Sequence, residues 1–222
     1  MPDSCTVAVL GGGSFGTVIA NIIACNGHRV RLFLRNQQRA ESINSHRQNV
    51  EYLPGYMLHD KLLATASLAD ATQGVDVVLV AVPSSSFREV ARELASHVTP
   101  QTLLVSLTKG IEPGGFMLMS EILRQELPAN PTGVLSGPNL AGEIAAGHIS
   151  GSVIASDNPQ INTRIHDLLH SESFLIYSSG DMYGVELGGA LKNVYAILAG
   201  VGAALEFGEN TIGMLLTRSL AE

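Results

Sequence analysis

The 222-residue sequence contains no tryptophan, and aromatic residues make up only 5% of it. Cysteine is almost absent as well, because Cys5 and Cys25 are the only two and they form no C-x-x-C motif. The sequence therefore gives no sign of a disulfide framework. We expect both cysteines to be reduced, packed thiols of a cytoplasmic protein.

Charged residues are also scarce, at 15% of the sequence, and no run of basic residues occurs. Thirteen Lys and Arg residues stand against 20 Asp and Glu residues, which gives a formal net charge of −7. Proteins that bind nucleic acids carry basic patches, so the sequence argues against nucleic acid as a partner. An anionic small molecule would have to be met by a local cationic pocket.

The sequence lacks a secretory signal and a clear membrane span. Residues 1–4 carry no basic stretch and precede no signal-like apolar core, which favours a cytoplasmic protein. The most membrane-like stretch is residues 187–205, but Lys192 and Asn193 lie inside it and several glycines lower its hydrophobicity. We interpret it as a buried helix of a soluble protein with no integral membrane segment.

A glycine-rich turn near the N-terminus is the first positive signal. The apolar residues 6–10 are followed by Gly11, Gly13 and Gly16 in a G-x-G-x-x-G pattern, and then by Val18, Ile19, Ile22 and Ile23 at helical spacing. Gly11 would allow the tight turn, Gly13 the approach of backbone to a pyrophosphate, and Gly16 the close packing of helix and strand. The pattern predicts a dinucleotide-binding domain, with a plain glycine turn as the alternative.

An expected acidic residue is missing after the second strand. An NAD-selective domain places an acid about 20 residues beyond the glycine turn, where it holds the ribose 2′-hydroxyl. Here residues 28–34 run out into Arg35, whose planar cation suits a 2′-phosphate. We therefore expect NADP(H) to be preferred, with NAD(H) possible. The alternative is that Arg35 is a solvated loop residue.

The rest of the sequence alternates between strand and helix patterns up to about residue 180. Residues 37–62 are polar and irregular apart from a short helix expected at 40–47. The pattern predicts an α/β fold with a doubly wound, mostly parallel Rossmann-type sheet, followed by the start of an α-helical C-terminal domain. We place the NAD(P)-binding domain at residues 1–180 and the opening helices of an α-helical substrate domain at 181–222. Further strands or helices are expected at 6–10, 75–82, 87–95, 103–107, 116–126, 134–135, 152–155, 161–170, 174–178, 184–205 and 210–221.

Two lysines are the best candidates for chemistry. Lys109 follows the carboxyl end of a strand, the edge at which open α/β sheets bind ligands. Lys192 lies in the apolar helix 184–205, where desolvation would lower its pKa into a range that allows proton exchange. The alternative for each lysine is a side chain that reaches solvent from an amphipathic surface.

The evidence for a metal site or a hydrolase nucleophile is weaker. His166 and His170 have zinc-like spacing, but no third ligand is evident and apolar residues occupy the other helix face, so we predict no metal site. The serines at 84–86 lack a G-x-S-x-G elbow, which argues against a hydrolase. We interpret them, with Pro83, as a loop that lines the nicotinamide and expect one serine to cap a helix.

Taken together, the motifs resemble the NAD(P)-dependent glycerol-3-phosphate dehydrogenases of bacterial type. The resemblance runs nearly from end to end, and many motifs in the same order are far more specific than any one of them. They comprise residues 11–16, 49–55 (NVEYLPG), 81–84 (AVPS), 108–110 (TKG), 136–138 (SGP) and 189–194 (GALKNV).

The resemblance implies an oxidoreductase that interconverts dihydroxyacetone phosphate and sn-glycerol 3-phosphate with NAD(P)H and feeds phospholipid synthesis. It implies that the cofactor contacts Ser14, Phe15, Arg35, Lys109 and Ala141, in addition to the glycines. It implies further that Lys109, Gly137, Asn139 and Lys192 bind the phosphorylated substrate, that Lys192 is the catalytic acid/base, and that the protein is a homodimer. Position 139 is commonly a small hydroxyl residue in the family, and Asn139 departs from that.

Two other functions remain open at this point. One is another two-domain NAD(P)-dependent hydroxy-acid dehydrogenase, and the other is a non-catalytic NAD(P)-binding module, which would have no use for a desolvated proton donor. In the family that the sequence resembles, an aspartate and an Arg-Asn pair further along complete the substrate site. No such motif occurs up to Glu222. We therefore expect this chain to bind NADPH, to reduce dihydroxyacetone phosphate poorly or not at all in steady turnover, and to associate through exposed apolar side chains.

Overall fold

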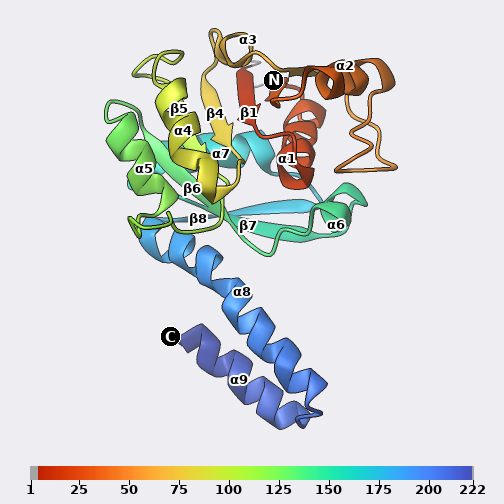
Figure 1. Cartoon of the computed structure of the whole chain (residues 1–222), viewed down its shortest axis with the longest axis vertical. Helices are drawn as coiled ribbons and strands as arrows, with labels where there is room; N and C mark the ends of the chain where they lie inside the picture. The colour runs from red at the N-terminus through yellow and green to blue at the C-terminus, as the bar shows by residue number, and fades with distance from the viewer. Residues whose placement is uncertain (1–4, 222) are drawn as a thin grey trace.

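The computed structural model describes residues 5–221 and consists of a single sheet covered by helices, with two long helices at its C-terminal end (Figure 1). Residues 1–4, to which the prediction about a secretory signal refers, lie outside the described part. The sheet has eight strands in the order β3-β2-β1-β4-β5-β6-β7-β8. They are β1 (Thr6–Leu10), β2 (Arg29–Phe33), β3 (Leu62–Thr65), β4 (Val77–Val80), β5 (Leu103–Ser106), β6 (Thr132–Ser136), β7 (Ser150–Ala155) and β8 (Phe174–Ser179).

All neighbouring strands are parallel except β6 and β7, which pair antiparallel with Leu135 opposite Ile154. The predicted mostly parallel Rossmann-type sheet is thus confirmed. Because β7 runs against β6, its first residues lie beside the carboxyl end of β6, at the edge where ligands bind. The reversal therefore adds β7 residues to that edge.

Helices follow most of the strands. They are α1 (Ser14–Cys25), α2 (Gln37–His46), α3 (Leu68–Thr72), α4 (Ser84–Leu94), α5 (Met119–Glu126), α6 (Ala141–Ala145), α7 (Pro159–Leu169), α8 (Met182–Ala204) and α9 (Glu209–Ala221). Several begin where the sequence supplies a cap, as in α2, where the Asn36 side chain accepts a hydrogen bond from the Arg39 N–H at 2.9 Å. The expected serine cap of α4 is wrong, because Pro83 occupies that position and offers no side-chain cap.

Alternating residues of the central strands pack into two hydrophobic cores, one on each face of the sheet. Val7 and Val9 of β1 pack with apolar residues of α1 and α7, whereas Ala8 and Leu10 pack with residues of α4 and α5. All four side chains are completely buried. Successive strand residues point to opposite faces, so a strand that is covered on both sides must be apolar throughout.

The order of strands reverses between β1 and β4, because the chain moves outward through β2 and β3 and then returns to the other side of β1. Doubly wound sheets bind ligands outside the carboxyl ends of their strands at such a switch point. The glycine turn follows β1, and residues 81–83 follow β4. Both motifs therefore lie at this point.

The two C-terminal helices extend beyond the α/β body (Figure 1). Helix α8 points away from the sheet, and α9 runs back along α8. By length and composition alone α8 could cross a membrane, although Glu186 and Lys192 lie within the helix, and a single helix of this kind is weak evidence for a span. In the structure 11% of its most apolar window is buried. The expectation that residues 187–205 form a buried helix is wrong for the part beyond Gly189. Apolar residues are exposed there, among them Val194 at 52% and Ile197 at 67%, because no other described segment covers them.

Three local expectations are also corrected. Strand β3 and helix α3 were not predicted. Residues 62–65 form a short outer strand in which Leu63 is exposed. Helix α2 begins at Gln37 rather than at 40, directly after its Asn36 cap. Both cysteines are free, but only Cys5 is packed, whereas Cys25 is exposed at the end of α1.

Candidate cofactor cleft and lysine pair

The glycine turn is built so that backbone segments touch. Gly11 has φ +126°, a region that disfavours side chains, and a Cβ there would overlap the Ala81 carbonyl at the end of β4. A Cβ on Gly16 would overlap the Gly11 carbonyl. Gly13 differs from both, because its φ is −75° and nothing lies within 4 Å of a Cβ placed on it. Gly11 and Gly16 thus serve packing, while Gly13 faces open space.

The buried side chain of Asn49 supports the glycine turn through two hydrogen bonds. Its side-chain N–H₂ donates to the Gly12 carbonyl at 2.9 Å and to the Thr17 hydroxyl at 2.8 Å, and the residue is 1% exposed. Asn49 belongs to one of the motifs on which the family resemblance rests, yet its supporting role could not be read from the sequence. The contact ties the loop after α2 to the start of α1.

A cleft of about 590 Å³ opens at the carboxyl ends of β1, β2, β4 and β5. Its lining includes eight of the residues that the sequence singled out, namely Gly11, Gly13, Phe15, Gly16, Arg35, Pro83, Lys109 and Asn139. Four others do not line it. Ser14 is the first residue of α1 and Ala141 the first of α6, while Gly137 and Lys192 lie behind the Lys109 end of the cleft.

Arg35, Arg39 and Tyr52 line the cleft beyond the glycine turn. The Arg39 guanidinium lies 4.9 Å from the centre of the Tyr52 ring and forms an ion pair of 2.5 Å with Glu51. This end of the cleft therefore carries two guanidinium groups and an aromatic face. Neither Arg39 nor Tyr52 was predicted as a cofactor-binding residue, although Tyr52 belongs to the motif at 49–55. The only signal for Arg39 was its position four residues after Arg35, near the start of a helix.

Lys109 stands at the other end of the cleft, just after β5. Its ammonium donates to the Gly137 carbonyl at 2.7 Å and lies 5.8 Å from the centre of the Phe15 ring. Burial and, to a smaller extent, the neighbouring Lys192 ammonium together lower the pKa of Lys109 to about 8. The sequence pattern predicted desolvation for Lys192 and did not predict it for Lys109.

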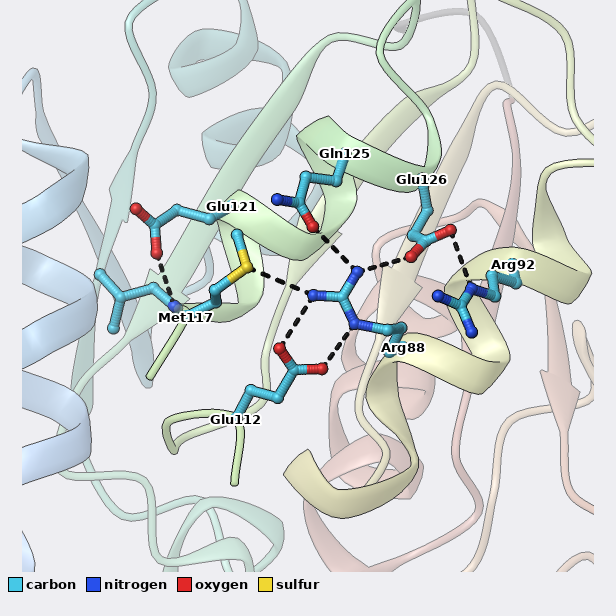
Figure 2. A network of polar contacts seen from close by, with 8 residues as sticks. Arg88, Arg92, Glu112, Met117, Glu121, Gln125 and Glu126 are labelled. Carbon is cyan, nitrogen blue, oxygen red and sulfur yellow. Dashed lines mark hydrogen bonds and ion pairs between the residues drawn. The ribbon is translucent and has the colours of Figure 1, made fainter. Parts of the chain in front are cut away.

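The loop that begins with Lys109 is fastened to helices α4 and α5 by Arg88 (Figure 2). The Arg88 guanidinium pairs with both carboxylate oxygens of Glu112, at 2.5 and 2.8 Å, and with Glu126 at 2.6 Å. These bonds hold the pKa of Arg88 above its ordinary value and the pKa values of both carboxyl groups below theirs. Gly110, at φ +148°, passes close to Ser84 at the start of α4.

Helix α8 places Lys192 next to Lys109. Gly189 packs so tightly on Ser136, at the end of β6, that a Cβ would overlap the serine hydroxyl and come within 3.9 Å of Lys109 Cγ. Lys192, three residues later, is half-buried next to Lys109. The apolar surroundings that its sequence neighbours suggested are incomplete, because Leu191 and Val194 are exposed.

Gly137 and Asn139 lie where β6 meets the start of β7. A Cβ on Gly137 would come within 2.7 Å of the Gly151 carbonyl, which explains the need for glycine there. The Asn139 side-chain oxygen accepts a hydrogen bond from the Ser152 hydroxyl at 2.7 Å. Its buried N–H₂ group has no partner among the described residues and is free to donate to a ligand.

Histidines do not form a comparable site. The rings of His166 and His170 stack at 4.5 Å, but the His170 ring accepts the Ile176 N–H at 3.2 Å and is thus engaged in the fold. No group of three or more His, Cys, Asp or Glu side chains that could hold a metal occurs in the part of the chain described here.

Comparisons with known proteins agree with this geometry. The family model for the N-terminus of NAD-dependent glycerol-3-phosphate dehydrogenase matches residues 6–162, and the model for its C-terminus matches residues 181–222. A glycerol-3-phosphate dehydrogenase (NAD(P)+) of Saccharophagus degradans is 54% identical over the whole chain, and one of Teredinibacter turnerae is 55% identical. The chain spans 62% and 65% of the length of these two curated relatives.

Solved structures give the same picture. The crystal structure of glycerol-3-phosphate dehydrogenase from Coxiella burnetii superposes with a TM-score of 0.91 at 35% identity, over 99% of this chain and 67% of that one. The enzyme from Saccharomyces cerevisiae gives a TM-score of 0.89 at 29% identity, over 99% and 69%. The resemblance inferred from the ordered motifs is thereby confirmed. The chain belongs to the NAD-dependent glycerol-3-phosphate dehydrogenase family.

Proposed function

We propose that this chain forms the cofactor cleft and the proton-donating group of an oxidoreductase that interconverts dihydroxyacetone phosphate and sn-glycerol 3-phosphate with NAD(P)H. The observation that carries the proposal is the pair of neighbouring ammonium groups, Lys109 and Lys192, at the end of a cleft that opens over the glycine turn. A module that only binds a nucleotide would need the turn but not the pair. The names of the relatives support the same reaction.

The cleft fits a dinucleotide in three respects. Gly13 leaves open space where a pyrophosphate would approach the N-terminus of α1, whose free N–H groups favour an anion. Phe15 and Pro83 offer apolar surface next to Lys109, where a nicotinamide ring would lie. Ser14 and Ala141 each begin a helix near this edge of the sheet, and their free backbone N–H groups are available to a ligand.

Arg35 and Arg39 would hold the 2′-phosphate of NADP(H). Arg39 would exchange its ion pair with Glu51 for the phosphate, and a phosphate with two negative charges would bind two guanidinium groups more tightly than the neutral 2′-hydroxyl of NAD(H). We therefore assign the chain a preference for NADP(H), with NAD(H) as a weaker alternative. Tyr52 would pack against the adenine.

When bound, the nicotinamide supplies the hydride to C2 of dihydroxyacetone phosphate and recovers it in the reverse reaction. Lys192 donates a proton from its ammonium to the C2 oxygen during reduction and takes it back during oxidation. Lys109 and the free N–H₂ group of Asn139 hold the substrate oxygens in place, and the Lys109 ammonium opposes the negative charge that develops on the C2 oxygen. Gly137 supports this arrangement through its bond from Lys109.

We assign residues 1–180 to the cofactor domain and residues 181–222 to the opening helices of a substrate domain. The change from alternating strands and helices to helices alone supports this division. The exposed apolar side chains of α8 and α9 are suited to a homodimer contact or to further helices of the same protein. A cytoplasmic location fits the two free thiols.

The test is the oxidation of NADPH by dihydroxyacetone phosphate, followed at the nicotinamide absorbance band with protein in excess, so that even a slow single turnover is recorded. We expect slow oxidation by the chain, and a rate lower by about 100-fold or more in Lys192→Ala. Lys61→Ala is the matched control, because Lys61 is an exposed lysine at the far end of the sheet, bound to the Gly27 carbonyl. NADPH binding without oxidation, or equal rates for the chain and Lys192→Ala, would overturn the proposal.

A further inference from the structure

We propose that Glu186 is a positioning residue that seats helix α8 on the N-terminus of α5 and thereby holds Lys192 beside Lys109. The inference deepens the proposed function and rests on it for its consequence in catalysis. Its structural content is independent of catalysis, because it concerns how one helix is held.

Glu186 is 5% exposed, although it lies in a helix whose later part is open to solvent. One of its carboxylate oxygens accepts the Ser120 N–H at 3.0 Å, and the other accepts the Ser120 hydroxyl in a short hydrogen bond. Ser120 is itself 3% exposed. The contact joins two segments that are 66 residues apart in the sequence.

This carboxylate completes the N-terminus of α5. The residue at the capping position is Leu118, whose side chain has no acceptor, so the first N–H groups of the helix need partners from elsewhere. Glu121 turns back to the Leu118 N–H at 2.7 Å. Glu186 supplies the acceptor for Ser120 from another helix, and its negative charge suits the positive end of the α5 dipole.

Two further contacts of α8 lie on the way from Glu186 to Lys192. Gly189, three residues after Glu186, is packed on Ser136 and close to Lys109, where no side chain could fit. Lys192 follows Glu186 by six residues, or about 9 Å along the helix axis. With Glu186 and Gly189 both fixed, the height and rotation of the helix are determined, and so is the place of Lys192.

The chemistry of Glu186 supports positioning over simple adhesion. Burial raises the pKa of its carboxyl group, and the hydrogen bonds from Ser120 and Met119 only partly oppose that effect. An apolar side chain would attach the helix without this desolvation cost, whereas two directed hydrogen bonds fix its register. The group that gains from a fixed register is Lys192.

The experiment measures the titration of the Lys109 side chain by NMR in the 222-residue chain, without cofactor or substrate. The Lys192 ammonium helps to hold the Lys109 pKa near 8, so Lys192→Met should raise that pKa. If Glu186 holds Lys192 in place, Glu186→Ala should cause a comparable rise. The double variant Glu186→Ala/Lys192→Met should give no further rise beyond that of Lys192→Met, because both changes remove the same neighbour.

Glu186→Gln and Ser120→Ala keep the shape of the contact and guard against a variant that does not fold. Each weakens one of the two hydrogen bonds, and we expect each to shift the Lys109 titration in the same direction by less. An unchanged Lys109 pKa in folded Glu186→Ala, Glu186→Gln and Ser120→Ala would overturn the proposal, and so would an unchanged pKa in Lys192→Met. Failure of the enzymatic assay would not affect these titrations, so the two proposals fail separately.

Discussion

Alanine substitutions at Gly13 and at Gly16, two glycines of the same turn, should have different effects. Gly13→Ala should impair cofactor binding, and Gly16→Ala should lower the stability of the fold. At Gly13 the backbone is in a conformation open to any residue, and nothing lies within 4 Å of an added Cβ. Gly13→Ala should therefore leave the fold intact: the smaller number of unfolded conformations of alanine stabilises it by about 0.4–1 kcal/mol, and the poorer capping of α1 by alanine offsets much of that gain. At Gly16 the same methyl group would overlap the Gly11 carbonyl.

The cost at Gly16 follows from two opposed terms. Overpacking costs about 1–3 kcal/mol, whereas alanine in a helix gains about 1 kcal/mol over glycine. Gly16→Ala should thus lose up to about 2 kcal/mol, which lowers Tm by up to about 8 °C in a chain of this size. Far-UV circular dichroism during heating measures both variants.

For NADPH affinity we expect the larger loss in Gly13→Ala. The Cβ of Gly13→Ala would fill the space open to the pyrophosphate and move it away from the N–H groups of α1. Loss of a hydrogen bond to a charged group costs about 1.5–3 kcal/mol, or roughly 10- to 100-fold in the Kd for NADPH. NADPH fluorescence measures this Kd. Normal NADPH affinity in Gly13→Ala, or a larger drop in Tm for Gly13→Ala than for Gly16→Ala, would refute the reasoning.

Four further outcomes are expected. Arg35→Asp should weaken NADPH far more than NADH in fluorescence titrations, because it exchanges attraction of the 2′-phosphate for repulsion, and equal losses would contradict the assignment. Lys192→Ala should lower the single-turnover rate about 100-fold or more while leaving the Kd for NADPH nearly unchanged; a parallel loss of both would point to misfolding. Because the folded pKa of Lys109, about 8, lies below its ordinary value of 10.5, the unfolded chain binds more protons between these values, so stability should rise with pH from about 8 to about 10.5. Urea denaturation should show this rise in the wild type and not in Lys109→Met; parallel pH profiles would count against it. Arg88→Met should free the loop around Glu112, seen as faster amide exchange there, with Arg92→Met as the control on the same helix; unchanged exchange would show that other contacts hold the loop.

Much of the fold was predictable, because the central strands are short apolar runs that burial on both faces requires. Strand β3 was missed because it is only four residues long and follows a polar, irregular stretch, and as an outer strand it leaves Leu63 exposed. The burial of α8 was also misjudged. An apolar helix is usually covered, but beyond Gly189 only α9 and the turn before it pack on this one, around Gly202, and most of its other side chains stay exposed.

The candidate site was predictable where a motif carries its own chemistry, as in the glycine turn and Arg35. Contacts made by residues far apart in sequence were not predictable. Arg39 lines the cleft beside Arg35 only because α2 begins soon after the end of β2, and Glu186 meets Ser120 only because α8 packs against β6. The lower pKa of Lys109 likewise depends on burial and on a neighbour 83 residues away, since the other lysine is Lys192.

The central claim is that the cleft between the glycine turn and the lysine pair binds NADP(H). Its most direct test is a fluorescence titration of the 222-residue chain with NADPH, in which enhancement of the bound nicotinamide reports occupancy. The account predicts saturable binding at one site per chain, reversed by added NADP+. A fluorescence change that does not saturate, or that NADP+ does not reverse, would contradict it.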